Sequence, residues 1–422
     1  MKKLLLILLI VNCSLPIVNS QWVKQTIPVN KPISGMKFID SLKGWACTNI
    51  STLGDTSFII STTNGGVNWN IQYTAPNVFF NSLFAINSSI VYVGGYDGGN
   101  NIYMLLKSTN GGLNWVNQNP TSVPSDLFFI NQDSGWYCDD FLGADVRTTT
   151  NGGQTWILRT SGLTDRINRL FFLNYSTGWA GSRYFKKTTN AGLNWLQIYD
   201  FATESIYSMY FINEQTGWAA LSGAKIGMTT NGGVNWIIQQ PSITSNNTTD
   251  IYMVNDTGWA GTSLLYKVYK TINGGLNWGQ QSDTSGSIRI SVINSNLAWS
   301  GNLGIARTTN GGGPITYLGI ININNNIPNT YKLYQNYPNP FNSQTKIKFS
   351  IPKRSVVSFK IYDILGREKT IWQSDKQLDA GTHELQFNAE DFASGVYFYS
   401  IIVSDETGST RFKETRKMIL VK

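Results

Sequence analysis

The sequence predicts an all-β protein: a seven-bladed β-propeller followed by a small Ig-like β-sandwich. Three observations predict this fold: a turn motif that occurs seven times, a second motif about halfway between its copies, and a change of character after residue 316. Aromatic residues make up 13% of the 422 residues and 40 residues are glycine, which suits many short strands. We expect a signal peptide at 1–20, the propeller at 21–316, a linker at 317–330 and the C-terminal domain at 331–422.

The turn motif has the form Thr-Thr-Asn-Gly-Gly-Val-Asn-Trp at residues 62–69. The steps between its asparagines range from 37 residues (273 to 310) to 46 (64 to 110), close to the length of a four-stranded blade. Asn-Gly is expected to supply the two φ > 0 positions of a hairpin turn, and the preceding Ser or Thr to bind turn backbone. We therefore expect structural turns at Asn64, Asn110, Asn151, Asn190, Asn231, Asn273 and Asn310.

The second motif is a Gly-Trp pair or a close variant of it. An apolar run and a polar turn usually precede it, as at residues 171–177, which is typical of a second hairpin. Two hairpins make a four-stranded blade. The aromatic residues of this motif are Trp45, Tyr92, Trp136, Trp179, Trp218, Trp259 and Trp299.

The two ends of the repeat region complement each other. The seventh turn, at Asn310, lacks its Trp, whereas Trp22 lies 47 residues before Trp69 with no turn ahead of it. We expect the segment at Trp22 to be the outer strand of the last blade. A sheet completed from the opposite terminus closes the ring and leaves no unpaired end.

The first twenty residues have the features of a secretory signal peptide. Lys2 and Lys3 precede an apolar stretch at 4–11, and a small residue, Ser20, ends the segment. The apolar stretch is too short to span a membrane.

Cys47 and Cys138 occupy the same position in blades one and three, and we expect two buried, unpaired thiols because such strands lie too far apart for a disulfide.

The C-terminal region contains strand-like segments that suit a β-sandwich of about 80 residues. They lie at 345–351, 356–362, 381–387, 395–403 and 411–421.

Several ordered motifs in this region resemble the C-terminal sorting domain of type IX secretion cargo. They are Tyr-Gln-Asn-Tyr-Pro-Asn-Pro-Phe-Asn at 334–342, Ile-Tyr-Asp-Ile-Leu-Gly-Arg at 361–367, and shorter segments at 378–383, 393–397 and 417–422. The resemblance implies that residues 331–422 engage the type IX secretion machinery and a sortase. The propeller would then pass through the periplasm and be secreted or attached to the outer cell surface.

The propeller has resemblances of its own. Its turns resemble the Asp-box of sialidases and related glycosidases, with Asn in place of Asp, and the whole repeat is similar to photosystem II assembly and stability factor propellers. In both families such turns are structural. The sialidase pattern includes an early Arg, but residues 25–28 are Gln-Thr-Ile-Pro, so the resemblance does not extend to a sialidase site.

The residue inventory limits the chemistry. The single histidine, His383, lies in the C-terminal domain, so the propeller has no His-based metal site and no Ser-His-Asp triad. We expect no cofactor and no metal. Residues 21–316 carry 17 Lys and Arg against 15 Asp and Glu, which does not favour nucleic acid as a partner. A glycoside hydrolase that uses two carboxylates is the alternative hypothesis.

Blade topology separates two faces. The repeated turns fall on one face, which we call the regular face, and the second turn of each blade and the connections between blades fall on the other, the variable face. Irregular loops on a rigid scaffold are where binding usually resides. We therefore predict a module that binds an extracellular protein or glycan, with a purely structural surface role as a further alternative. The candidate partner-binding residues are Arg166, Arg169, Arg183, Asp97, Asp139 and Asp140.

Overall fold

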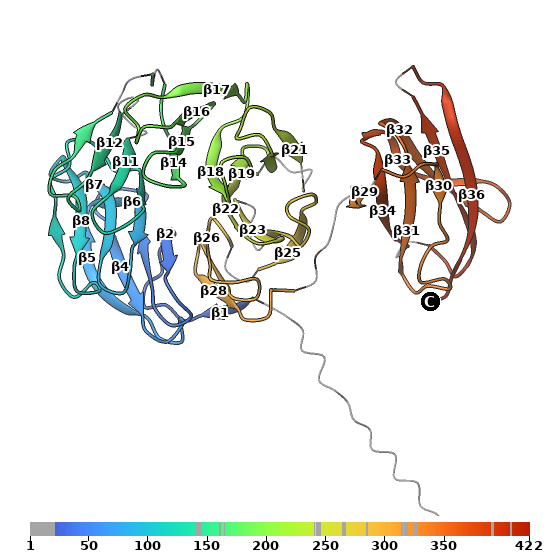
Figure 1. Ribbon diagram of the computed structural model, residues 1–422. Helices are drawn as coiled ribbons and strands as arrows, with labels where there is room; N and C mark the ends of the chain where they lie inside the picture. The colour runs from blue at the N-terminus through green and yellow to red at the C-terminus, as the bar shows by residue number, and fades with distance from the viewer. Residues whose placement is uncertain are drawn as a thin grey trace, which may run out of the picture.

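The computed structural model describes residues 22–139, 145–159, 162–163, 165–239, 241, 246–263, 267–283, 286–313, 315, 320–324, 327–389, 392–405 and 407–422. Every named element in these ranges is a β-strand, and none of the described residues belongs to a helix able to cross a membrane. Seven four-stranded antiparallel sheets form a ring, and two further sheets form a separate C-terminal unit (Figure 1). The predicted signal peptide at 1–20 lies outside the described residues.

Each blade consists of four consecutive strands, except the last. Blade one contains β2 (Ile33–Phe38), β3 (Gly44–Thr48), β4 (Thr56–Thr62) and β5 (Asn70–Pro76). Blade two contains β6 (Val78–Ala85), β7 (Val91–Asp97), β8 (Ile102–Ser108) and β9 (Val116–Asn117), and blade three contains β10 (Asp126–Phe129), β11 (Gly135–Asp139), β12 (Asp145–Thr149) and β13 (Ile157–Leu158). Blade four contains β14 (Arg169–Phe172), β15 (Gly178–Gly181), β16 (Tyr184–Thr188) and β17 (Leu196–Asp200).

The remaining blades follow the same plan. Blade five contains β18 (Ile206–Phe211), β19 (Gly217–Leu221), β20 (Lys225–Thr229) and β21 (Ile237–Gln239), and blade six contains β22 (Thr248–Val254), β23 (Thr257–Thr262), β24 (Lys267–Thr271) and β25 (Gly279–Ser282). Blade seven contains β26 (Arg289–Val292), β27 (Ala298–Gly301), β28 (Ile305–Thr308) and the N-terminal strand β1 (Val23–Gln25). The predicted count of seven blades is confirmed.

The ring closes through the N-terminal strand, as predicted. β1 pairs antiparallel with β28, with Val23 opposite Arg307 and Gln25 opposite Ile305. Trp22, immediately before β1, is buried and belongs to the apolar cluster that contains Trp259. The first described residues therefore complete the last sheet.

The repeated turn is built by side chains that bond to backbone. In blade one the Thr62 hydroxyl accepts hydrogen bonds from the Asn64 and Gly66 amides, and Asn64 Oδ1 accepts one from the Asn68 amide at 2.9 Å. The bonds to the Ser or Thr hydroxyl recur in all seven turns. The two positive φ angles belong to Gly65 (70°) and Gly66 (93°), so the expectation that the Asn supplies one of them was wrong. The turn is wider than a two-residue hairpin, and the Asn acts through its side chain instead.

The aromatic residues of the second motif join neighbouring blades. The indole Nε1 of Trp45 donates to the carbonyl of Gly111 in the next blade's turn at 3.0 Å, and Trp299 of blade seven donates to Gly65 of blade one at 3.1 Å. Equivalent bonds are Tyr92 to Gly152, Trp136 to Ala191, and Trp179 to Gly232. On the regular face, each of these blades is thus tied to the next.

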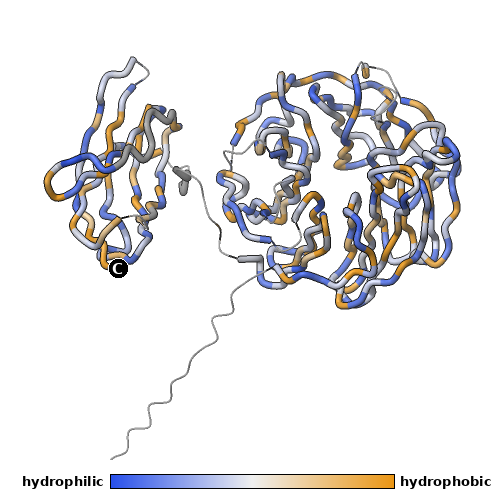
Figure 2. The backbone as a smooth tube through the Cα atoms, turned by 180° about the vertical axis from the view of Figure 1, so that it is seen from behind, coloured by the Kyte–Doolittle hydropathy of each residue, from blue (hydrophilic) through white to orange (hydrophobic). Residues whose placement is uncertain are grey.

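The Gly of the Gly-Trp pair is explained by a close approach of a phenylalanine. A Cβ at Gly135 would lie 2.3 Å from Cδ1 of Phe129, and that ring is stacked on Tyr92 of the preceding blade with centroids 4.3 Å apart. Gly44, Gly178 and Gly217 meet phenylalanines in the same way. Hydrophobic and hydrophilic stretches are interspersed along both units (Figure 2). Every residue of β3, β11, β15 and β19 is buried, because both faces of a blade pack against neighbouring blades.

The C-terminal unit is a β-sandwich. One sheet has the order β29 (Ile320–Asn324), β34 (Gly381–Asn388), β31 (Gln344–Ile351) and β30 (Lys332–Leu333), and the other β33 (Glu368–Leu378), β32 (Ser355–Asp363), β35 (Gly395–Ser404) and β36 (Thr410–Leu420). Buried side chains of the two sheets form one core, which includes Phe349, Phe359 and Leu385. The segment 317–330, expected as a linker, contributes β29 because its Ile-Ile-Asn-Ile-Asn sequence forms a strand that pairs with β34.

The opening motif of the C-terminal domain is anchored on the sandwich. The Tyr399 hydroxyl donates to the Tyr334 carbonyl at 2.9 Å and accepts from the Asn336 amide at 2.8 Å. The Phe341 amide donates to the Ile419 carbonyl of β36. The opening motif and the last strand, which are far apart in the sequence, thus hold each other in place.

Candidate binding site

The inner strands of the seven blades surround a cavity of about 380 Å³. β2, β6, β10, β14, β18, β22 and β26 all contribute to its wall. Each inner strand starts after a connection on the variable face, so the first residues of these strands lie toward that face. The cavity therefore occupies the central channel of the propeller.

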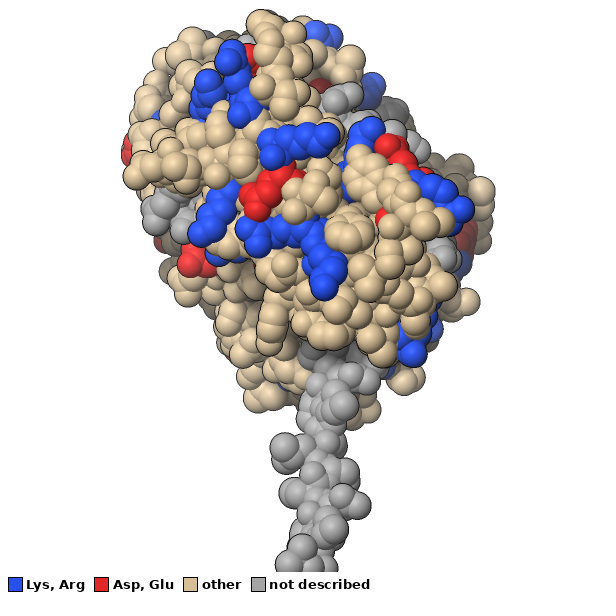
Figure 3. Space-filling view, turned by 90° about the vertical axis from the view of Figure 1, so that its right-hand side faces the viewer, with Lys and Arg blue, Asp and Glu red and all other residues tan. Residues whose placement is uncertain are grey.

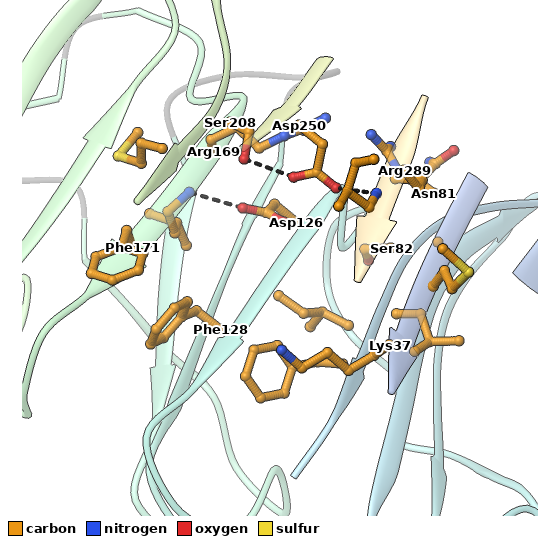
Figure 4. Close-up of a pocket in the computed structure, with 18 of the residues that line it drawn as sticks. Lys37, Asn81, Ser82, Asp126, Phe128, Arg169, Phe171, Ser208, Asp250 and Arg289 are labelled. Carbon is orange, nitrogen blue, oxygen red and sulfur yellow. Dashed lines mark hydrogen bonds between the residues drawn. The ribbon is translucent and has the colours of Figure 1, made fainter. Parts of the chain in front are cut away.

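The side chains in this channel form two levels (Figure 4). In several blades the deeper side chain comes from the residue two positions after the polar one in the same strand, for example Phe128 after Asp126 and Phe171 after Arg169. At about 3.3 Å per residue, two residues along a strand place the deeper level about 7 Å further into the channel. The level nearer the variable face is polar and contains Asn81, Asp126, Arg169, Ser208, Asp250 and Arg289. The deeper level contains Phe84, Phe128, Phe171, Tyr210 and Tyr252.

The deeper level is a continuous aromatic floor that spans blades two to six. Its neighbouring ring centroids are 5.2 to 5.6 Å apart, in the order Phe84, Phe128, Phe171, Tyr210 and Tyr252. Lys37 of blade one extends the floor, because its Nζ donates to the Tyr252 hydroxyl at 2.8 Å. Burial alone would lower the pKa of Lys37, but the charge interaction and hydrogen bond with Tyr252 raise it above its usual value.

Both carboxylates of the polar level bind to the neighbouring blade. Asp126 accepts a hydrogen bond from the Leu170 amide at 2.9 Å, and Asp250 accepts from the Ser208 hydroxyl and the Ile290 amide, each at 3.0 Å. Burial raises the pKa of Asp126, although the nearby Arg169 charge and the Leu170 amide oppose that shift. These two carboxylates join inner strands.

The guanidinium groups of Arg169 and Arg289 each have N–H donors that are not used in hydrogen bonds among the described residues. Arg169 donates from Nε to the Tyr207 carbonyl and from Nη1 to the Asn168 carbonyl, and Arg289 donates from Nε to the Ser34 carbonyl at 2.5 Å. Among the described residues, Nη2 of Arg169 and both terminal nitrogens of Arg289 have no hydrogen-bond partner. Burial lowers the pKa of Arg289, and the positive charge of Arg169 adds to that effect. With Lys37, the cavity contains three cations and two carboxylates.

The predicted arginines lie in three different environments. Arg169 lines the cavity. Arg166 is exposed in the connection that leads into blade four. Arg183 lies between β15 and β16, where its Nε is 3.0 Å from Oδ1 of Asp200. Only one of the three therefore faces the central channel.

The predicted acidic residues do not line this cavity. Asp97 holds its own loop, because Oδ1 accepts the Gly99 and Asn100 amides at 2.9 and 3.0 Å. Asp139 is buried at the end of β11, opposite Asp145 of β12. Asp140 lies outside the described residues. Cys47 and Cys138 are both buried, and neither is in a disulfide among the described residues. Burial raises the pKa of the Cys47 thiol to about 11.

Several residues of the cavity were missed by sequence reasoning, namely Lys37, Asp126, Asp250, Arg289 and the aromatic floor. One pattern could have found part of this set. The first strand of a blade often has a polar residue three positions before its last apolar residue, as in Asp126-Leu-Phe-Phe129 and Arg169-Leu-Phe-Phe172. Aligning the inner strands on that last apolar residue would have placed the charges in one ring.

Comparison with protein families identifies the kind of domain at the C-terminus. Residues 335–419 match the family described as secretion system C-terminal sorting domain. This region is a sorting domain. The protein is accordingly exported to the cell surface or the extracellular space, and the type IX secretion machinery handles it. Among curated proteins, none matches the chain.

Solved structures resemble the propeller. YCF48 bound to D1 peptide superposes with a TM-score of 0.55 at 19% identity, covering 68% of this chain and 96% of that one. YCF48 from Cyanidioschyzon merolae gives 0.54 at 14%, covering 68% and 99%. A GH74 xyloglucanase from Xanthomonas campestris gives 0.54 at 10%, covering 94% and 68%. The predicted likeness to the photosystem II assembly factor is confirmed at the level of the fold, and identities this low carry no more than the fold.

Proposed function

We propose that the protein is an exported binding module whose propeller takes an acidic polypeptide segment into the mouth of its central channel. The observation that carries the proposal is the set of free guanidinium donors of Arg169 and Arg289 above an aromatic floor. The sorting domain supplies export, and the propeller supplies recognition.

The charges of the cavity favour an anionic ligand. Its two carboxylates already accept hydrogen bonds from neighbouring strands, whereas its arginines retain donors. A carboxylate from a ligand would form charge-assisted hydrogen bonds with those donors and balance the excess positive charge. The half-buried setting strengthens such bonds relative to bulk water.

The shape of the cavity favours a peptide side chain or terminus over a larger group. A volume of about 380 Å³ accommodates a small group rather than a folded domain. The aromatic floor offers an apolar side chain a place to pack below the ring of charges. YCF48, which shares this fold, has been solved with a D1 peptide. A glycan is the alternative ligand.

A glycoside hydrolase is less well supported. Asp126 and Asp250 are the carboxylates of the channel, and each is engaged by a backbone amide of the next blade. Such carboxylates serve the packing of the blades, and the similarity to a xyloglucanase is one of fold.

The proposal is tested by probing the leaderless full chain with an array of acidic peptides and a glycan array. Changing Arg166, Arg169 and Arg183 together to Ala is expected to weaken binding of an acidic peptide by about 1 to 3 kcal/mol. In single variants Arg169→Ala is expected to account for most of that loss, and Arg183→Ala for least because Asp200 already pairs with it.

Because Arg169 also holds two backbone carbonyls, a second variant separates binding from stability. Asn81→Trp would fill the cavity from β6 and leave the bonds of Arg169 in place. We expect it to abolish peptide binding with an unchanged melting temperature. Unaltered binding in both Arg169→Ala and Asn81→Trp would refute the site, and turnover of a glycan lost in Asp126→Asn would favour the hydrolase.

A further inference from the structure

The sorting domain has an exposed apolar turn between β32 and β33. Ile364 and Leu365 in this turn are 70% and 72% exposed. The buried carboxylate of Asp363 holds the turn, because its Oδ1 accepts the amides of Leu365 at 2.9 Å and Arg367 at 3.0 Å. Two large apolar side chains therefore lie mostly in solvent, on a turn whose backbone is held by Asp363.

A groove of about 330 Å³ lies next to this turn, on the outward face of the sheet that contains β32, β35 and β36. Tyr362 and Phe398 are directly opposite each other in neighbouring strands and form its aromatic wall. The hydroxyl of Thr415 donates to that of the buried Ser400 at 3.1 Å, also within the groove. The turn and the groove together form a protrusion beside a depression, which is a shape suited to docking a protein.

Basic side chains surround the turn and the groove. Lys413 and Lys417 have no ion pair among the described residues, and Arg367 and Lys369 share the single carboxylate of Asp363 at 2.7 and 3.7 Å. Two further cations on these strands are paired with carboxylates, Lys360 with Glu368 and Arg416 with Glu414. The surroundings therefore carry a net charge of about +3. The face of the molecule shown in Figure 3 likewise presents more Lys and Arg than Asp and Glu.

We propose that Ile364, Leu365 and the adjoining groove are the surface through which the sorting domain docks on the export machinery. The partner is a protein surface with an apolar pocket for Ile364 and Leu365 and an acidic rim facing Lys413 and Lys417. Charge complementarity selects an acidic partner, and the protruding apolar pair requires a pocket instead of a flat surface. This docking site is separate from the ligand site proposed for the propeller.

The test uses the full chain expressed in a host that has type IX secretion, with fractionation into periplasm, cell surface and medium. The variant Ile364→Ser/Leu365→Ser is expected to reduce the exported fraction by about tenfold or more, as loss of a central docking contact would. Folded protein should accumulate in the periplasm. The matched control is Leu113→Ser in the propeller, whose side chain is 74% exposed and whose export should remain unchanged.

A second variant tests the charges without removing apolar contacts. Lys413→Glu/Lys417→Glu is expected to block export, while Lys348→Glu/Lys353→Glu, with the same change in charge but not on the sheet that bears the groove, should leave it intact. Normal export of the first pair and of the apolar variant would overturn the proposal, as would equal loss in the control pair. Binding of the purified chain to phosphatidylglycerol vesicles that disappears in Lys413→Glu/Lys417→Glu would assign the surface to lipid and also overturn it.

Discussion

The regular and the variable faces of the propeller differ in how they are held together. On the regular face one arrangement recurs, in which an aromatic side chain of one blade bonds to the turn of the next, as Trp45 does to Gly111 and Trp299 to Gly65. On the variable face the side-chain contacts vary more between blades, as with the pair of Lys31 and Asp55 in blade one. The repeated face thus fixes the ring, and the other face is free to differ from blade to blade.

This difference also separates stability from recognition. A residue that recurs in every blade serves a need that every blade has, namely packing and turn geometry. The charged residues of the channel break the repeat, since the equivalent positions hold Asp126 in blade three and Arg169 in blade four. In the proposed function, this asymmetry would give the ligand an orientation.

The largest effect on folding stability is expected at β1, the N-terminal strand that completes the last blade. Deleting residues 21–30 removes β1 and the buried Trp22, which leaves β28 as an unpaired edge. We expect a loss of about 3 to 5 kcal/mol or more, and a melting temperature lower by about 5 to 15 °C in calorimetry.

The control for closure is Val23→Ala, since Val23 belongs to the same strand but is 60% exposed. It should change the free energy of unfolding by less than about 0.5 kcal/mol. An unchanged melting temperature in the deletion variant would mean that the ring does not depend on β1.

A smaller effect on folding stability is expected at Lys270, which also bonds to the turn of the next blade on the regular face. This buried lysine donates to the Gly311 carbonyl of the next blade's turn and lies over the Trp259 ring at 4.6 Å. Burial lowers its pKa to about 8. Between pH of about 8 and about 10.4, the unfolded chain therefore holds a proton that the folded chain has released, so folding stability rises with pH in that window.

The measurement is the free energy of unfolding of wild type and Lys270→Met by urea titration from pH 7 to 10. At pH 7 the full cost of burying the charge is present, and we expect Lys270→Met to be more stable by about 1 to 2 kcal/mol despite losing a hydrogen bond. The advantage should shrink toward pH 10. Lys24→Met, on the exposed β1, serves as the control, and a difference that grows with pH would contradict the assignment.

The sequence predicted the propeller well because its repeats have local physical causes. The glycines of the turn must adopt positive φ, and Gly135 must leave room for Phe129, so these residues mark each blade. The sandwich was predicted less completely. The strand β33, with the sequence Glu-Lys-Thr-Ile-Trp-Gln-Ser-Asp-Lys-Gln-Leu, shows no clear alternation, and β29 is a short strand in a polar stretch.

The candidate ligand site could not be predicted from the sequence for a related reason. Its charged residues come from five inner strands that are distant in the chain. The sign of the charge changes from blade to blade, so no single residue type marks the position. The predicted patch of arginines grouped residues by proximity in sequence, whereas the ring places Arg169 beside Asp126 and Arg289 and directs Arg183 toward Asp200. Sequence distance is a poor guide inside a channel built from one strand per blade.

The smallest effect is expected at Ala191, where the turn of blade four departs from the repeat. Ala191 has φ of 61°, a conformation that its counterparts Gly65, Gly111 and Gly152 adopt without a Cβ. An L-residue in this region is strained by about 1 to 2 kcal/mol, and the greater freedom of an unfolded glycine offsets part of that strain. Ala191→Gly should therefore raise stability by about 0.5 to 1 kcal/mol, as measured by urea unfolding.

The reverse exchange in another blade sharpens this comparison. Gly152→Ala would introduce the same strain and also place a Cβ 2.9 Å from the Gln132 carbonyl oxygen, so it should cost more than Ala191→Gly gains. The Trp136 indole donates to the backbone carbonyl of residue 191, so this bond does not need the Ala side chain and should survive the change to Gly. If Ala191→Gly lowered stability instead, the Ala methyl group would contribute packing that outweighs its backbone strain, and the turns of the regular face would not be interchangeable.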